Sequence, residues 1–503
     1  MKKFIYATLA LAAVLLFASC KNDKNQPKNE AGDAYISFSF NLPQGGTRAG
    51  VGDKHATDLY VGTEAEQAIQ KVRVVLFDPS SEVVKYAFDY NITGNGTNAP
   101  TGDGIAPNGT AATTARFTTK AKEVVTQDYK MLAIINGTAE VLAATAEGKY
   151  LKDAQAVLTS DVATLSGAGK AIMMSNDRGL VDVKSTSMKK KDTEAEAAPV
   201  TVNVDRILAK VFVGGTPTFA NGKLTNIKWQ LNTTNTKTFI YRQFAQVNTN
   251  LDTFADETAT DGSTRFNRYA KDPNYSGTFN AADFTYLEGT PGLNGTFGFN
   301  DADGQYCLEN TMDAPSQKVQ QTTTFILSGT WTPDNHDGIT FTEGETWYDW
   351  KGFSFTKAKM VEYKAIIDDA TNTKPEINGT PNGFKAALKA AITAGLTVDA
   401  QGDVTAAGQF GDIVAYKDGA CYYQSLLIRH FNNAQSAKEM GYGRYGVVRN
   451  NIYKINIKEI KHVGTPTVTN DKDNPRNDDP SMSYISFDVN VNPWIVREQD
   501  ISL

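Results

Sequence analysis

Side chains that commonly perform catalysis or bind metals are scarce in this sequence of 503 residues. It contains three cysteines and four histidines: Cys20, Cys307, Cys421, His55, His336, His430 and His462. None of them stands at the short spacings of a zinc or iron site. The P-loop, GxSxG, HExxH and dinucleotide-binding motifs are also missing. We therefore expect a protein that is not an enzyme and that binds no metal or cofactor.

Two weaker candidates for chemistry remain. Asp301-Ala302-Asp303-Gly304 begins like a calcium-binding loop, but the acidic ligand expected further along is missing, which favours a turn. Cys307 and Cys421 could form a disulfide in an oxidising compartment. Because the sequence does not give their separation, the paired and the free states are both open.

The remaining cysteine follows a segment that is typical of secretion. Met1-Lys2-Lys3 is positively charged, residues 4–17 form an apolar run, and small residues precede Cys20. This pattern resembles a lipoprotein signal, with Phe17 in place of the commoner Leu, and cleavage would leave Cys20 as a lipid-modified N-terminus. A plain secretory peptide with an incidental cysteine is the alternative. In either case we expect the mature chain to lie outside the cytoplasm.

The overall composition is that of a soluble globular protein. Apolar residues make up 41% and charged residues 21% of the chain. The formal net charge is −6, and no broad basic face is available to neutralise phosphates, so we expect no nucleic acid partner. A chain of this length is expected to fold as two domains.

Short strands separated by loops rich in Gly, Asn, Thr and Pro indicate an all-β sandwich fold. The expected strands are residues 35–42, 71–78, 115–121, 129–136, 171–176, 200–215, 224–232, 322–329, 355–368, 420–430, 450–461 and 484–491. Stretches rich in Ala and Leu at 139–158 and 383–396 predict helices beside the sheets. We place the domain boundary near residue 240 and a polar, acidic linker at 465–482.

The first and last strands have nearly the same sequence. YISFSFNL (35–42) and YISFDVNV (484–491) are identical at five of eight positions, and both alternate apolar with polar residues. The apolar face consists of Ile36, Phe38, Phe40 and Leu42 in the first strand and of Ile485, Phe487, Val489 and Val491 in the last. Two segments with one pattern could occupy one site in turn. The alternative is that each strand pairs within its own domain, which would leave only Trp494 to Leu503 for another partner.

The first strand is followed by a glycine-rich stretch, residues 43–50, in which Arg48 is the single arginine. The stretch has no periodicity, so we expect an exposed loop of the kind that proteases cut.

These features together resemble the fimbrillins, the structural subunits of type V pili, and most of all the shaft subunit of the minor, or short, fimbriae. The matching stretches are GGTRAG (45–50), KVRVVLFD (71–78), VDRILAKVFV (204–213), IKWQLN (227–232), YCLEN (306–310), VVRNNIYKINIKEIK (447–461) and FDVNVNPWIVREQDISL (487–503). The resemblance covers nearly the whole chain and is strongest at its two ends.

The resemblance implies two transthyretin-like β-sandwich domains and a staged assembly. Cys20 would be the lipidated residue, and an Arg-specific protease would cut between Arg48 and Ala49. The first strand, with Ile36, Phe38, Phe40 and Leu42, would then be displaced, and the segment Tyr484 to Leu503 of another subunit would replace it. The expected anchors of this donor segment are Ile485, Phe487, Val489, Val491, Trp494, Val496, Ile501 and Leu503.

The implied domain order is a signal peptide (1–19), a propeptide with the temporary strand (20–48), two sandwich domains (49–240 and 241–464) and a linker with the donor strand (465–503). The implied function is a pilus subunit that polymerises head to tail and supports adhesion. An accessory or tip adhesin of the same pilus, or a surface glycan-binding lipoprotein, is the alternative.

The implied location is the outer membrane for the lipoprotein precursor and then the cell-surface fimbrium. The expected partners are identical subunits, anchor and tip subunits, the maturation protease, and host or bacterial surface ligands.

Overall fold

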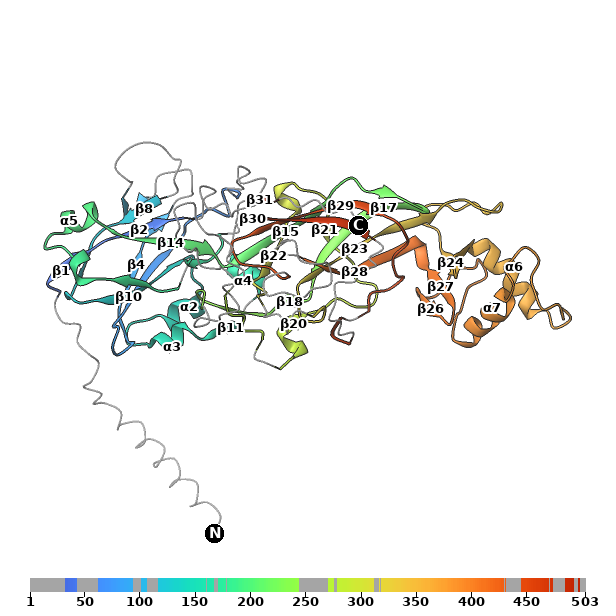
Figure 1. Cartoon of the computed structure of the whole chain (residues 1–503), viewed down its shortest axis with the longest axis horizontal. Helices are drawn as coiled ribbons and strands as arrows, with labels where there is room; N and C mark the ends of the chain where they lie inside the picture. Colours follow the sequence, from blue (N-terminus) through green and yellow to red (C-terminus); the bar gives the residue numbers. More distant parts are fainter. Residues whose placement is uncertain are drawn as a thin grey trace, which may run out of the picture.

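The computed structural model is an elongated molecule in which strand-rich parts follow one another along the longest axis (Figure 1). It describes residues 32–42, 62–93, 101–105, 116–159, 161–166, 171–177, 179–243, 270–275, 278–311, 316, 318–428, 430, 445–469, 471–473, 485–492 and 496–497. Strands dominate the described residues and helices are few and short, which confirms the predicted all-β class.

The first domain is built on one large sheet. Its strand order is β4 (Val84–Tyr90), β3 (Val72–Phe77), β10 (Tyr129–Ile135), β12 (Met174–Asn176), β14 (Val200–Arg206), β2 (Phe38–Asn41), β8 (Arg116–Thr119) and β7 (Gly104–Ile105), and β13 (Val181–Val183) also pairs with β10. Two small two-stranded sheets accompany it: β1 (Ala34–Ile36) with β9 (Lys122–Val124), and β5 (Ile92–Thr93) with β6 (Thr101–Gly102). Apolar residues of β1, β2, β3, β10 and β14 form one buried cluster.

Short helices lie between β10 and β14 in the sequence. They are α2 (Ala139–Ala144), α3 (Leu151–Ala154), α4 (Val162–Ser166) and α5 (Asp192–Ala197). The predicted helix over 139–158 is therefore interrupted, and its end forms β11 (Val157–Thr159). Gly148, between α2 and α3, has a φ of 80°, a left-handed conformation that a continuing helix cannot contain.

The second domain is a sandwich of two sheets. One has the order β16 (Thr218–Phe219), β29 (Ile452–Ile460), β15 (Leu208–Gly214) and β22 (Gln305–Leu308), with β30 (Ile485–Asn492) and β31 (Val496–Arg497) also paired to β29. The other has the order β21 (Gly295–Thr296), β17 (Gly222–Asn232), β23 (Thr324–Pro333) and β28 (Ala420–Leu427). Two short pairs, β11 with β19 (Lys237–Phe239) and β18 (Thr234–Asn235) with β20 (Phe284–Thr285), lie beside these sheets.

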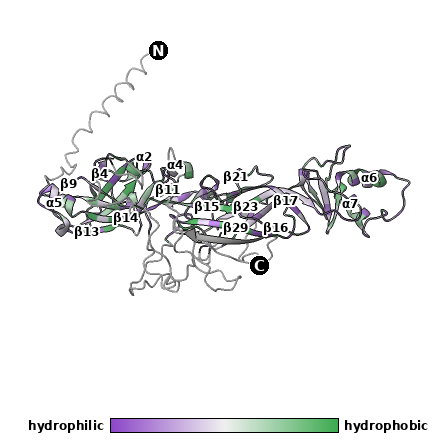
Figure 2. Cartoon of the chain, turned by 90° about the horizontal axis from the view of Figure 1, so that it is seen from above, coloured by the Kyte–Doolittle hydropathy of each residue, from purple (hydrophilic) through white to green (hydrophobic). Residues whose placement is uncertain are grey.

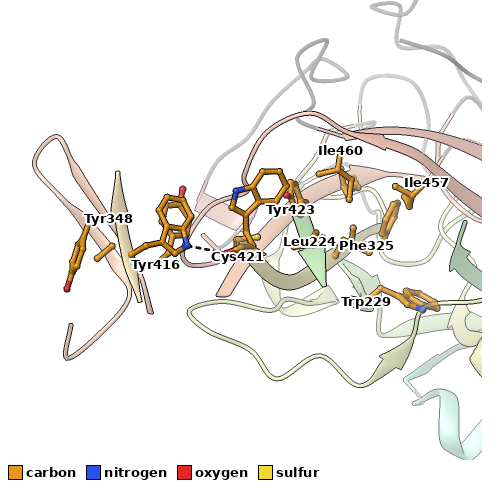
Figure 3. Packing of buried hydrophobic residues seen from close by; sticks show 14 of the residues in the cluster. Leu224, Trp229, Phe325, Tyr348, Tyr416, Cys421, Tyr423, Ile457 and Ile460 are labelled. Carbon is orange, nitrogen blue, oxygen red and sulfur yellow. Dashed lines mark hydrogen bonds between the residues drawn. The ribbon is translucent and has the colours of Figure 1, made fainter. Parts of the chain in front are cut away.

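Hydrophobic residues fill the space between the two sheets. Figure 3 shows Leu224, Phe325 and Ile457, from β17, β23 and β29, in one buried cluster. Hydrophobic residues likewise gather on the strands of the first domain, for example on β4 and β14 (Figure 2).

An insertion of residues 334–419 separates β23 from β28, and we call it the distal module. It consists of β24 (Trp347–Trp350), β25 (Phe353–Thr356), α6 (Lys357–Asp368), α7 (Phe384–Thr393), β26 (Gly408–Phe410) and β27 (Ile413–Tyr416). It lies at the end of the molecule opposite to the first domain (Figure 1). Phe384, on the predicted helix 383–396, packs edge-on against Phe353, Phe355 and Tyr363.

The sequence predicted a single strand at 355–368, and this prediction is wrong. Only Phe353–Thr356 is a strand, and α6 follows it. The Thr356 side chain caps the helix by accepting a hydrogen bond from the Lys359 amide. Ala, Lys, Met and Glu then fill the segment, and these residues favour helix.

The chain passes from the first domain to the second at Ile207. β14 ends at Arg206 and pairs with β2 and β12, whereas β15 starts at Leu208 and pairs with β22 and β29. The predicted boundary near residue 240 thus falls after β15 and β17, which both belong to the second sandwich. The sequence pattern hid this change because both strands are apolar and only one residue separates them.

Candidate functional site

The predicted first strand, residues 35–42, forms β1 and β2, and β2 lies in the interior of the first sheet. We call residues 34–42 the plug. Its β2 runs parallel to β14, with Phe38 opposite Val200, and antiparallel to β8, with Phe40 opposite Phe117. Within the described residues, β8 has only β2 and β7 as partners, so the β7–β8 pair joins the large sheet through the plug.

The apolar side of the plug is fully enclosed. Ile36, Phe38 and Phe40 have no exposed surface and Leu42 is 8% exposed, as the alternating pattern predicted. The Phe40 ring stacks on Phe117 with the ring centres 4.8 Å apart. At about 1.5–3 kcal/mol for each large apolar side chain, these four residues contribute roughly 6–12 kcal/mol of burial free energy.

Polar atoms of the plug are paired as well. The Phe38 amide donates to the Thr119 hydroxyl at 3.1 Å, and the Ser37 hydroxyl donates to the Thr119 carbonyl at 2.7 Å. At the end of β2 the Asn41 amide group donates to the Asn203 side chain at 2.8 Å. Since Ser37 and Ser39 are also buried, both faces of the plug are covered.

The N-terminal end of the plug is held by backbone contacts. Tyr35 and Lys189 exchange two backbone hydrogen bonds of 2.8 and 2.9 Å, and the Asp33 amide donates to the Val124 carbonyl. The Asp33 carboxylate accepts hydrogen bonds from Thr126, which lower the pKa of this carboxyl group. Both strands of the plug, β1 and β2, are thus integrated in the first domain.

The last strand takes a different position. β30 pairs antiparallel with β29, with Ile485 opposite Ile460, Phe487 opposite Ile457 and Val489 opposite Ile455. β31, which contains Val496, pairs in parallel with the start of β29. Both strands belong to the sheet of the second domain, so within one chain the two similar strands occupy different sheets. Val491 lies in β30, whereas Trp494, Ile501 and Leu503 lie outside the described residues.

The start of the predicted linker is attached to the second domain. Thr465 and Tyr422 exchange two backbone hydrogen bonds of 2.8 Å, and Val468 and Gly289 exchange two of 2.7 and 2.8 Å. Val468 is buried. The predicted modification sites Cys20, Arg48 and Ala49 lie outside the described residues and stay predictions.

The cysteines in the described residues do not form a disulfide. Cys307 and Cys421 are both free and buried, and burial raises the pKa of each thiol to about 12.

The predicted turn at Asp301–Asp303 is a short 3-10 helix, in which the Asp303 carboxylate accepts a hydrogen bond from the Asn300 amide. The described residues hold no group of three or more His, Cys, Asp or Glu side chains that could bind a metal ion. In the same residues no helix has the length and hydrophobicity needed to cross a membrane.

Sequence reasoning missed two buried ionic clusters between the domains. In the first, Lys210 of β15 lies 2.6 Å from Glu66, which also accepts the Tyr306 hydroxyl. Glu66 and Lys210 are at most 1% exposed. The sequence feature that could have indicated this buried ion pair is the lysine inside the apolar run ILAKVFV (207–213).

The second cluster, which we call the junction cluster, consists of Asp205, Arg242, Glu309, Arg449 and Asn450. Arg242 lies 2.5 Å from the Asp205 carboxylate and 3.8 Å from that of Glu309, which in turn lies 3.2 Å from Arg449. The Asn450 amide group donates to Asp205 at 2.7 Å. These side chains connect the end of β14, the end of β22 and the start of β29. Burial lowers the pKa of Arg449, and Glu309 opposes that shift.

Two protein-family models match the chain. The model described as major fimbrial subunit protein (FimA) matches residues 34–206, which begin at the plug and end at β14. The model described as major fimbrial subunit protein type IV, fimbrillin, C-terminal, matches residues 414–500, which include β28, β29 and β30. A search of curated protein sequences gave no significant match.

The chain is similar to several solved structures. They include a protein of Parabacteroides distasonis provisionally described as a cell adhesion protein (12% identity, TM-score 0.42, covering 94% of this chain and 99% of that one). A fimbrilin of Porphyromonas gingivalis W83 has 16% identity and a TM-score of 0.40, covering 93% and 99%. The tip fimbrial protein of Porphyromonas gingivalis with a C-terminal truncation has 10% identity and a TM-score of 0.31, covering 90% and 99%. The two family matches lie toward opposite ends of the chain and together cover about half of it, and the chain therefore belongs to the fimbrillin family of fimbrial subunit proteins.

Proposed function

We propose that the chain is a shaft subunit of a cell-surface pilus of the minor-fimbria type, and that it polymerises head to tail by donor-strand exchange. The precursor is a lipoprotein anchored to the outer membrane through Cys20. An Arg-specific protease cuts between Arg48 and Ala49, the plug leaves the first domain, and the C-terminal segment of another subunit takes its place. Anchor and tip subunits of the same pilus complete the assembly.

The position of β2 between β14 and β8 is the observation that carries this proposal. A strand at a sheet edge can be lost while the rest of the sheet stays paired. Loss of an interior strand leaves two unpaired edges and an apolar trench, a surface that aggregates unless another strand fills it. Since a propeptide strand placed there is cut away at Arg48, a replacement strand is required.

The register of the plug defines what the replacement must look like. A strand that fills the same space runs parallel to β14 and antiparallel to β8, and it offers apolar residues at every second position. Ile485, Phe487, Val489 and Val491 have this spacing. In the described residues β30 pairs with β29 and contacts β31. Release of β30 therefore breaks the hydrogen-bond ladder between β29 and β30.

Processing and assembly can be tested together at Arg48. We expect Arg48→Ala to give a folded, lipidated monomer that forms no denaturation-resistant ladder, whereas replacement of Lys54, a basic residue six positions further along, by Ala should leave assembly normal. N-terminal sequencing of assembled fibres should begin at Ala49. Fibres of the Arg48→Ala variant, or assembled subunits that begin at Cys20, would contradict the proposal.

A cavity in the distal module favours an adhesive role as the second candidate. It has a volume of about 320 Å³, near the lower end of small-molecule pockets, and both apolar and polar side chains line it. The buried Tyr363 and Ile377 and the exposed Lys374 and Asn378 are among the residues that line it. A Lys374→Glu variant that keeps the polymer ladder but adheres less to host or bacterial surfaces would support this role. Unchanged adhesion would contradict it.

A further inference from the structure

One extended segment joins the site of the plug to the strand that leads to the C-terminal segment. β14 forms a wall of the plug site, and β15 follows it after a single buried residue, Ile207. β15 then runs parallel to β29, with Lys210 opposite Ile452 and Gly214 opposite Asn456. β16 continues the pairing, with Phe219 opposite Ile460. In the sequence, β29 is followed by the linker and the C-terminal segment.

This arrangement determines how tension passes through a subunit of the polymer. In a head-to-tail polymer, a pull enters the first domain through the strand seated against β14 and reaches the N-terminal end of β15. The pull leaves through the C-terminal end of β29. Because the two strands are parallel and are pulled from opposite ends, their hydrogen bonds are stretched lengthwise and all share the force. A pull on both strands at the same end would instead break these bonds one after another.

The junction cluster lies where the two strands begin. Asp205, at the end of β14, is bound to Arg242 at 2.5 Å and to Asn450 at 2.7 Å, and Asn450 lies two residues before the start of β29. The Asn450 amide donates to the Leu208 carbonyl, and the Lys210 amide donates to the Asn451 carbonyl, at 2.8 and 3.0 Å. Side-chain and backbone bonds therefore tie the end of β14 to the starts of both strands.

The charged members of the cluster are also out of contact with water. The Asp205, Arg242, Glu309 and Arg449 side chains are at most 5% exposed. Removal of one partner alone would leave an uncompensated buried charge, which strongly destabilises the folded protein.

We propose that β15, β29 and the junction cluster form a mechanical clamp that transmits tension along the pilus and resists unfolding of the shaft subunit. The assignment of this role rests on the proposed head-to-tail assembly. The mechanical property itself belongs to the single chain and can be measured without polymer, so failure of the clamp and failure of the assembly proposal are distinguishable.

The test is single-molecule force spectroscopy of the full chain carrying Cys20→Ser, with handles attached through two introduced cysteines. For a lengthwise pull the handles are placed at Thr201→Cys, on β14, and His462→Cys, just after β29; both residues are exposed. For a pull at one end, Thr218→Cys on β16 replaces Thr201→Cys. The two native thiols are buried, and we expect this burial, which also raises their pKa, to keep them unlabelled at neutral pH.

We expect the lengthwise pull to require a clearly higher unfolding force than the pull at one end. Equal forces in the two geometries would overturn the proposal, and this comparison needs no change in the cluster. In the lengthwise geometry Glu309→Gln should raise the unfolding rate at a fixed force by about tenfold or more, because it breaks a buried ion pair. Asp412→Asn, which removes an exposed ion pair in the distal module, is the matched control and should leave the rate unchanged. An unchanged rate in Glu309→Gln would exclude the cluster from the clamp.

Discussion

Replacement of Phe40 by Ala should destabilise the precursor but leave the assembled polymer unaffected. In the precursor the Phe40 ring has no exposed surface and stacks on Phe117. Loss of a buried Phe side chain costs about 3–5 kcal/mol of unfolding free energy. For a domain of 150–250 residues each kcal/mol lowers the melting temperature by about 2–4 °C, so the first domain of the precursor should melt roughly 6–20 °C lower.

The polymer provides the contrasting measurement. If the plug is absent from assembled subunits, Phe40→Ala cannot change their stability. Phe117→Ala alters the wall of the site, which stays in the polymer, and should lower both the precursor melting temperature and the temperature at which polymer ladders dissociate. Tyr150→Ala, at a side chain that is 47% exposed, is the control and should change neither quantity. Polymers weakened equally by Phe40→Ala and Phe117→Ala would refute the reasoning, because the plug would then persist in the fibre.

Three further predictions concern the second domain and the junction. Deletion of 494–503 removes only the two-residue strand β31 from the sheet of the second domain, so it should lower the melting temperature of the monomer only slightly but abolish the ladder if these residues anchor the donor; an intact ladder would limit the donor to β30. Burial on its own would raise the pKa of Glu66, but Lys210 and hydrogen bonds lower it below its ordinary value of 4.5. The ionised Glu66 side chain therefore stabilises the protein above pH 4.5, and this stabilisation is lost as the pH falls through the lowered pKa. Glu66→Gln should then make the unfolding free energy less dependent on pH in the acid range, and an unchanged pH dependence would contradict this. Cys307 and Cys421 should resist alkylation at pH 8 in the native monomer and react in denaturant, because burial raises the pKa of both thiols to about 12; rapid labelling of the native monomer would contradict their burial.

The alternating pattern of the first strand predicted the buried apolar face of the plug, because burial there follows the side-chain period of two. Ile36, Phe38 and Phe40 were predicted to lie on the buried face, and they are fully buried. The same rule could not reveal that Ser37 and Ser39 are buried too. A small polar side chain is compatible with either face, and its burial depends on segments distant in the sequence.

The run VTVNVDRILAKVFVGG (200–215) shows where the pattern fails. It was predicted as one strand, yet β14 and β15 belong to different sheets. Both halves satisfy strand propensity, and the change occurs at Ile207, directly after the charged pair Asp205-Arg206. Partners such as Arg242 and Asn450 come from distant segments, so the buried cluster that fixes this change could not be inferred from local sequence.

The difference between the two similar strands leads to a last prediction. If YISFDVNV replaces YISFSFNL in the same register, Asp488 takes the place of Ser39, which has no exposed surface. In its own domain Asp488 lies opposite Asn456, a residue that is only half-buried. A carboxylate in the position of Ser39 would be costly to bury without a cationic partner. Asp488→Ser should therefore raise the dissociation temperature of polymer ladders, while Asn490→Ser, two positions along the same strand, should not. An Asp488→Ser polymer of ordinary stability would mean that the donor strand binds in a shifted register or through residues 494–503, since Asp488 would then not occupy the buried position.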